Sequence, residues 1–97
     1  MEEKKVFADI HIYDYKGKYW LLDRIAQEVI SMGIEFVTCG QNDESDGYVT
    51  VNVTREQARA LDKKYKHFNL CYGRGKTFDE CFDDALRIEE IYEKTRR

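Results

Sequence analysis

Two hydrophobic periods alternate along this chain, and their order constrains the fold more than any other feature. Apolar residues recur at every second position over 6–13, 34–39, 48–53 and 68–72, which is the period of a β-strand. Over 19–32 and about 55–66 they recur with helical spacing, and Gly33 stands where the first helix should end. The pattern predicts strand, helix, strand, strand, helix and strand, followed by a C-terminal helix.

This order predicts an α+β domain of ferredoxin-like βαββαβ topology. Right-handed crossovers would give an antiparallel sheet of order 4-1-3-2 with two helices on one face. The 97 residues suffice for one domain, 1–97, with the βαββαβ core over 6–72 and an extra amphipathic acidic helix over 77–94. We expect a polar hairpin loop over 40–47. In the strand before it, alternation places Thr38 toward the helices, and Val37 and Cys39 on the outer face.

The C-terminal helix carries the charge imbalance of the chain. Over 77–93 Arg87 is the only basic residue among seven acids, whereas basic and acidic residues balance over 1–76. Thr77 and Glu80 form a capping-box pattern, and acids near a helix start also complement the helix dipole. The alternative is an acidic face that docks on a basic partner surface. The candidate partner-binding residues are then Asp79, Glu80, Asp83, Asp84, Glu89 and Glu90.

The loop before this helix reads Gly73-Arg-Gly-Lys-Thr77 and ends like a phosphate-binding loop. That motif requires a glycine six positions before the lysine, where this chain has Leu70. The loop is therefore too short to wrap a phosphate chain. We interpret it as a glycine turn and a helix cap, and we expect no nucleotide cofactor.

The sequence contains no catalytic or metal-binding pattern that we would assign. His11 and His67 are the only histidines, and Asp9 and Cys71 share the predicted outer face with His11. This set could suit metal or acid–base chemistry, but its spacing matches no known motif. The three cysteines are odd in number and widely spaced, which favours reduced thiols in a cytosol. We expect no enzyme activity, no metal and no cofactor.

The outer face of the predicted sheet is the alternative binding site, through Phe7, His11, Tyr13 and Tyr48. Aromatic side chains on central strands can stack RNA bases. The third strand lacks the basic and aromatic run that usually accompanies this use, and the net charge of −3 disfavours phosphate binding. Where Phe78, Phe82 and Tyr92 pack decides whether this face is covered or open.

Residues 6–53 resemble the ACT-like regulatory domains. The resemblance rests on the turn Asp14-Tyr-Lys-Gly17 after the first strand and on Gly33-Ile34 before the second. The departure is the insertion of Lys18, Tyr19 and Trp20 before the next leucine. The resemblance implies a homodimer that senses a small ligand near Asp14–Tyr19.

We therefore expect a small non-enzymatic regulatory or inhibitory module that acts in the cytoplasm by protein–protein binding. Its partner would be a basic or nucleic-acid-binding protein, and an origin in a phage or mobile element is one option. The alternatives are the ACT-like homodimeric sensor and RNA binding on the open sheet face. We expect no direct nucleic-acid contact in the leading interpretation. The chain has no apolar run long enough for a membrane span.

Overall fold

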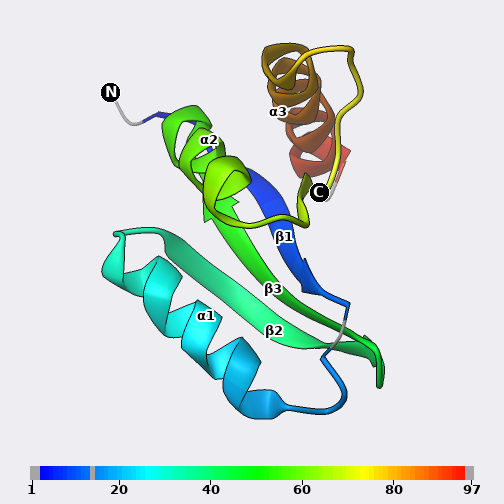
Figure 1. Ribbon diagram of the computed structural model, residues 1–97. Helices are drawn as coiled ribbons and strands as arrows, with labels where there is room; N and C mark the ends of the chain where they lie inside the picture. The colour runs from blue at the N-terminus through cyan, green and yellow to red at the C-terminus, as the bar shows by residue number, and fades with distance from the viewer. Residues whose placement is uncertain (1–2, 14, 96–97) are drawn as a thin grey trace.

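A computed structural model describes residues 3–13 and 15–95 of the chain (Figure 1). It is a small α+β fold with a four-stranded antiparallel sheet and three helices. Within the described residues, no helix combines the length and apolarity needed to cross a membrane. The elements are β1 (Val6–Ile12), α1 (Tyr19–Ser31), β2 (Glu35–Asp43), β3 (Asp46–Val53), α2 (Arg55–Lys64), β4 (Phe68–Leu70) and α3 (Phe78–Thr95).

The sheet is built around the pairing of β1 with β3. Strand β1 pairs with β3 over its full length, from Val6 opposite Val53 to Ile12 opposite Gly47. Strand β2 adds to the outer edge of β3, and the three-residue β4 adds to β1. The resulting order is β2-β3-β1-β4, which is the expected 4-1-3-2 read from the opposite edge. The two long central strands form a platform, and each of the three helices contacts at least one of them.

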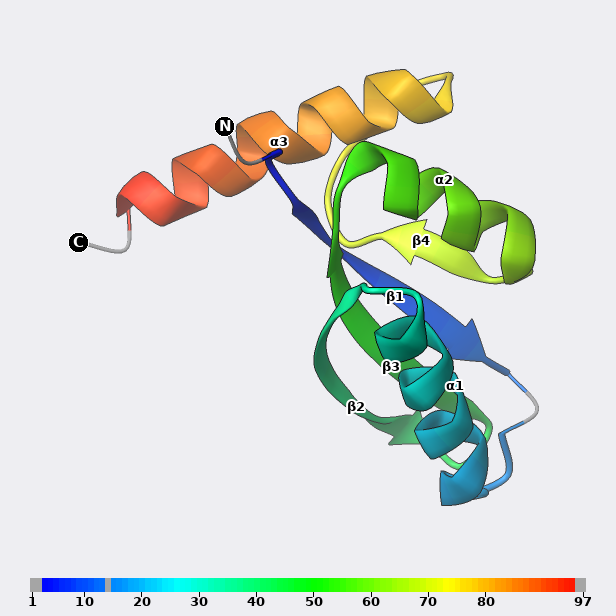
Figure 2. The same ribbon diagram turned by 90° about the vertical axis from the view of Figure 1, so that its left-hand side faces the viewer.

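One face of this platform holds the hydrophobic core. Alternate residues of β1 and β3 are fully buried, as the period of a strand requires. Helices α1 and α2 lie on this same face (Figure 2) and bury their apolar stripes against it. The buried set from these elements comprises Val6, Ala8, Ile10, Val49, Val51, Val53, Leu22, Ala26, Val29, Ala58 and Leu61.

Helix α3 also joins the core on the helix side. Phe82 and Ala85 of its first half are fully buried in the same cluster, and the guanidinium of Arg55 on α2 lies 4.6 Å from the centre of the Phe82 ring. Phe78 stacks on Phe82 at 6.3 Å between ring centres. Figure 2 shows the first half of α3 beside α2 and its second half extending past the start of β1. The first half of the helix therefore leaves the outer face around Tyr13 uncovered, whereas its second half lies beside the Phe7 end of that face.

The hairpin between β2 and β3 is tighter than the sequence suggests, and the predicted loop over 40–47 is wrong. Only Glu44 and Ser45 connect the strands. Asp43 Oδ1 accepts hydrogen bonds from the backbone N–H and the hydroxyl of Ser45 at 2.8 and 2.7 Å, which closes the turn locally. The Tyr48 side chain lies over Gly40, where a Cβ atom would come within 2.8 Å of the hydroxyl oxygen. The pairing of β2 with β3 therefore extends into residues whose types usually form turns.

A β-bulge at Val37 corrects the predicted faces of β2. Phe36 lies opposite Val51, but the next paired residue, Thr38, lies opposite Thr50. One extra residue in a strand reverses the alternation beyond it. Thr38 therefore belongs to the outer face, and Cys39, opposite Val49, belongs to the helix side.

The turn after β1 is anchored by a side chain that the sequence did not mark as core. Tyr15 is fully buried, and its ring packs against Gly47 so closely that a Cβ atom there would lie 2.8 Å from Tyr15 Cγ. Lys16 and Gly17 then adopt left-handed φ values of 51° and 70° before α1 begins. Gly47 is thus required by close approach, because any larger residue would displace the Tyr15 ring.

We predict that Phe82→Ala lowers the free energy of unfolding by about 3–5 kcal/mol, the usual cost of deleting a buried phenylalanine ring. Ile91→Ala is the matched control, because Ile91 lies on the same helix with 48% of its surface exposed, and we expect a change within about 1 kcal/mol. Chemical denaturation followed by circular dichroism measures both. Equal effects of the two substitutions would contradict the packing of α3 described above.

Candidate functional site

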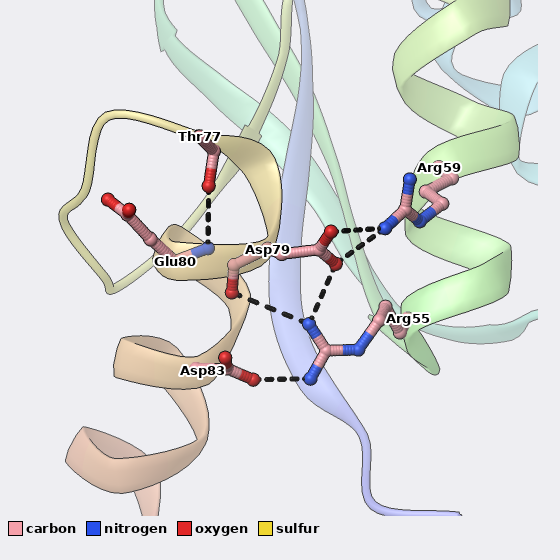
Figure 3. Close-up of polar contacts among 6 residues, drawn as sticks. All are labelled: Arg55, Arg59, Thr77, Asp79, Glu80 and Asp83. Carbon is pink, nitrogen blue, oxygen red and sulfur yellow. Dashed lines mark hydrogen bonds and ion pairs between the residues drawn. The ribbon is translucent and has the colours of Figure 1, made fainter.

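The acids at the start of α3 form an ion-pair network with α2 (Figure 3). Asp79 accepts two hydrogen bonds from Arg59 at 2.5 and 2.6 Å and one from Arg55 at 3.0 Å. Arg55 also pairs with Asp83. These side chains remain between one third and two thirds exposed, so each pair alone contributes little to stability. Together they fix the first turns of α3 beside α2.

The glycine loop before α3 serves as a helix cap. Thr77 Oγ1 accepts a hydrogen bond from the Glu80 N–H at 3.1 Å, as the capping-box pattern predicts. The Glu80 carboxylate accepts from the N–H of Lys76 at 2.8 Å, one residue earlier than in the usual box. A Cβ atom at Gly75 would lie 2.5 Å from Glu80 Cβ. The loop is packed onto its own helix, which agrees with a turn and a cap.

The three remaining candidate acids also have internal partners. Asp84 pairs with Arg87 at 2.7 Å and accepts from the N–H of Arg74, and Glu90 pairs with Lys4 at 2.6 Å. Glu89 Oε2 accepts a hydrogen bond from the backbone N–H of Phe7 at 2.9 Å. Phe7 lies beyond the part of β1 that pairs with β4. All six predicted partner-binding acids therefore make contacts within the chain. Docking of a partner on this acidic face stays a prediction.

The candidate aromatic residues of the outer face gather around His11. The rings of His11 and Tyr13 stack at 5.6 Å between centres, and Tyr48 lies 6.4 Å from His11. His67 meets the other side of Tyr13 edge-on at 4.7 Å. His11 and His67 are thus joined through Tyr13, which keeps 51% of its surface exposed. Phe7 lies farther along β1, half-buried.

Two carboxylates flank His11 on the same face. His11 Nδ1 lies 3.0 Å from Asp46 Oδ1, and His11 Nε2 lies 4.0 Å from Asp9 Oδ2. Hydrogen bonds from Asn42 and then from His11 hold the pKa of Asp46 below its usual value. Asp9 in turn accepts from the Thr50 hydroxyl at 2.5 Å. The sequence missed Asp46, because it lay inside the predicted loop.

The Cys71 thiol lies beside Asp9 in this cluster. Partial desolvation, and then the nearby Asp9 carboxylate, raise the pKa of the Cys71 thiol to about 12, which disfavours its thiolate form at neutral pH. Within 3–13 and 15–95, no three or more His, Cys, Asp and Glu side chains are grouped in a way that would hold a metal ion. The arrangement offers aromatic surface and carboxylate acceptors, which suit the binding of a positively charged group.

A groove of about 630 Å³ opens where the outer face meets the second half of α3. Its apolar lining comes from both sides of the groove, and Tyr72 and Tyr92 pack together in it at 5.3 Å between ring centres. Asn52 also lines it, and the buried Oδ1 of this residue has no hydrogen-bond partner among the described residues. Its lining residues include Phe7, Asn52, Tyr72, Tyr92, Glu89 and Glu93, together with Lys4 and Lys5.

The turn implicated by the ACT-like resemblance is only partly described. Asp14 lies outside the described residues, and Tyr15 is buried in the core. Tyr19 and Trp20 at the start of α1 are 69% and 59% exposed. A small-ligand site in this turn and a homodimer built on it stay predictions. No protein-family model, curated protein or solved structure matches the chain.

We predict that Glu89→Ala and Glu89→Gln differ in stability. Alanine leaves the Phe7 N–H without an acceptor, which costs about 1–3 kcal/mol. Glutamine keeps an acceptor oxygen and removes a carboxylate whose pKa is raised by burial, so its stability at pH 7 should equal or exceed that of the parent chain. Hydrogen exchange of the Phe7 amide should accelerate only in the alanine variant. Equal exchange in both variants would contradict the contact.

We also predict that the Asp79 network makes stability depend on pH in acid. Hydrogen bonds from Arg59 and then Arg55 lower the pKa of Asp79 from its ordinary 3.8. The stability that these bonds contribute to the folded state is fully present above pH 3.8. It is lost as the pH falls through the lower pKa that Asp79 has in the folded state. The denaturation midpoint should therefore fall less steeply below about pH 4 in Asp79→Asn. Glu44→Gln, in the hairpin turn, is the control and should retain the parent slope.

Proposed function

We propose that this chain is a non-catalytic protein-binding module of ferredoxin-like topology whose contact surface is the open outer face of its sheet. The observation that carries the proposal is the position of α3. Its aromatic residues Phe78 and Phe82 pack beside α2, and they leave Tyr13 and its neighbours uncovered. An uncovered face with a contiguous aromatic cluster is a typical association surface.

The charge of this face favours a basic protein segment as its partner. None of the four described strands contains a lysine or an arginine. Acids of the outer face include Asp9 and Asp46, whereas Glu35, opposite Asn52 on β3, pairs with Lys5 at 3.4 Å. Nucleic acid would meet carboxylates where its phosphates need cations. A basic protein segment meets complementary charge and aromatic rings together.

The acids at the start of α3 are not part of the proposed contact surface. Those acids hold α3 against α2, and a partner that took them would compete with Arg55 and Arg59. The exposed ring of Tyr13, on the open face, has no comparable role in holding α3 against α2. A regulatory or inhibitory role follows if the segment that binds here belongs to a larger assembly.

We predict that a short arginine-rich peptide binds the outer face with an affinity that falls as salt is added. In an NMR titration the amide shifts should concentrate on β1 and β3. Tyr13→Ala should raise the dissociation constant by about fivefold or more, as loss of an exposed aromatic anchor does. Tyr19→Ala removes an exposed tyrosine at the start of α1 and should leave the affinity unchanged.

Two outcomes of the same titration would refute the proposal. Shifts confined to Asp79, Asp83 and their neighbours would place the contact on the acidic face of α3 instead. A single-stranded oligonucleotide that shifts β1 and β3 where the peptide does not would replace the protein partner with RNA.

A further inference from the structure

We propose that the groove between the outer face and α3 is an anchor pocket for one arginine side chain of the partner. This inference rests on the proposed function and names the chemical group that the surface selects. The groove volume of about 630 Å³ lies within the range of specific ligand sites. An arginine side chain, with its apolar stem and planar charged end, would occupy only part of it.

The charge balance inside the groove favours a cation. Glu90 and Glu93 on α3 border it together with Glu89. Lys4 is already committed to Glu90 at 2.6 Å, and Lys5 to Glu35 at 3.4 Å. Glu93 makes no ion pair within the part of the chain that the structure describes. The groove also lies along the last turns of α3, where the helix dipole attracts positive charge.

The walls and the floor favour a guanidinium over an ammonium group. Phe7, Tyr72 and Tyr92 supply aromatic surface, on which the planar guanidinium stacks. The carboxylate acceptors along the groove are the second oxygen of Glu89 and the Glu93 carboxylate. Arginine presents five N–H donors in a fixed fork, whereas lysine presents a compact charge. A forked donor can serve several acceptors at once.

Lys4 is a cation of this chain that already pairs with a carboxylate beside the groove. Its ammonium group pairs with Glu90, and its side chain is 68% exposed beside the groove. An incoming guanidinium would be repelled by Lys4 and would compete with it for the α3 carboxylates. Removal of Lys4 should therefore strengthen binding. A merely structural role for this residue would not produce that sign.

The test uses the full chain, isotopically labelled, and two short peptides that differ at one position. One carries a single arginine among glycine and serine residues, and the other carries citrulline, which is nearly isosteric but neutral. We expect the arginine peptide to shift the amides of Asn52, Glu89 and Glu93, and the citrulline peptide to leave them unchanged. Glu93→Gln should weaken the binding of the arginine peptide about two- to fivefold, and Lys4→Ala should strengthen it by a similar factor.

The outcomes separate this inference from the proposed function. If the arginine peptide shifts His11 and Tyr13 but not the groove, the open face binds basic segments and the anchor pocket is refuted. If the arginine-rich peptide binds nowhere on the outer face, the proposed function itself fails. Equal affinity for the arginine and citrulline peptides would show that the positive charge does not contribute to binding, and it would refute the arginine pocket. Binding of free arginine amide as tight as that of the peptide would make the groove a small-molecule site instead.

Discussion

The docking of α3 beside α2 decides which surface of this protein is free. Phe82 and Ala85 enter the core on the helix side, and the Arg55 guanidinium covers the Phe82 ring. Burial of an aromatic ring outweighs any single exposed ion pair, so we assign the anchoring of α3 to Phe82 and its orientation to the Asp79 network. Had the same stripe packed on the other face, the aromatic cluster around Tyr13 would be covered and the acids of α3 would be the remaining contact surface.

The outer face combines features that serve one kind of contact. Its aromatic rings are close-packed around His11, and its strands carry acids without any lysine or arginine in their described residues. At one end it continues into the groove beside α3, where Glu89 both accepts a hydrogen bond from the Phe7 N–H of β1 and lines the wall. The same carboxylate thus links the edge of the sheet to the binding surface that we propose.

Local sequence patterns predicted the elements of the fold well, because alternation in β1 and β3 and helical spacing in α1, α2 and α3 are strong local signals. They failed where a single residue changes the phase of a strand. The bulge at Val37 exchanged the faces of Thr38 and Cys39, and the turn at Asp43 extended two strands into residues that resemble a loop. The groove was not predictable in this way, since it depends on the direction in which α3 leaves the glycine loop. The pairing of Glu89 with Phe7 joins residues 82 positions apart, and no local pattern encodes that contact.

The most direct test of this account is a set of nuclear Overhauser contacts from aromatic rings in solution. The account predicts contacts from the Phe82 ring to the side chain of Arg55 and to the Phe78 ring, and from Tyr13 to His67. Contacts from Phe82 to Tyr13 or Tyr48 would contradict it, because they would place α3 across the face that we describe as open.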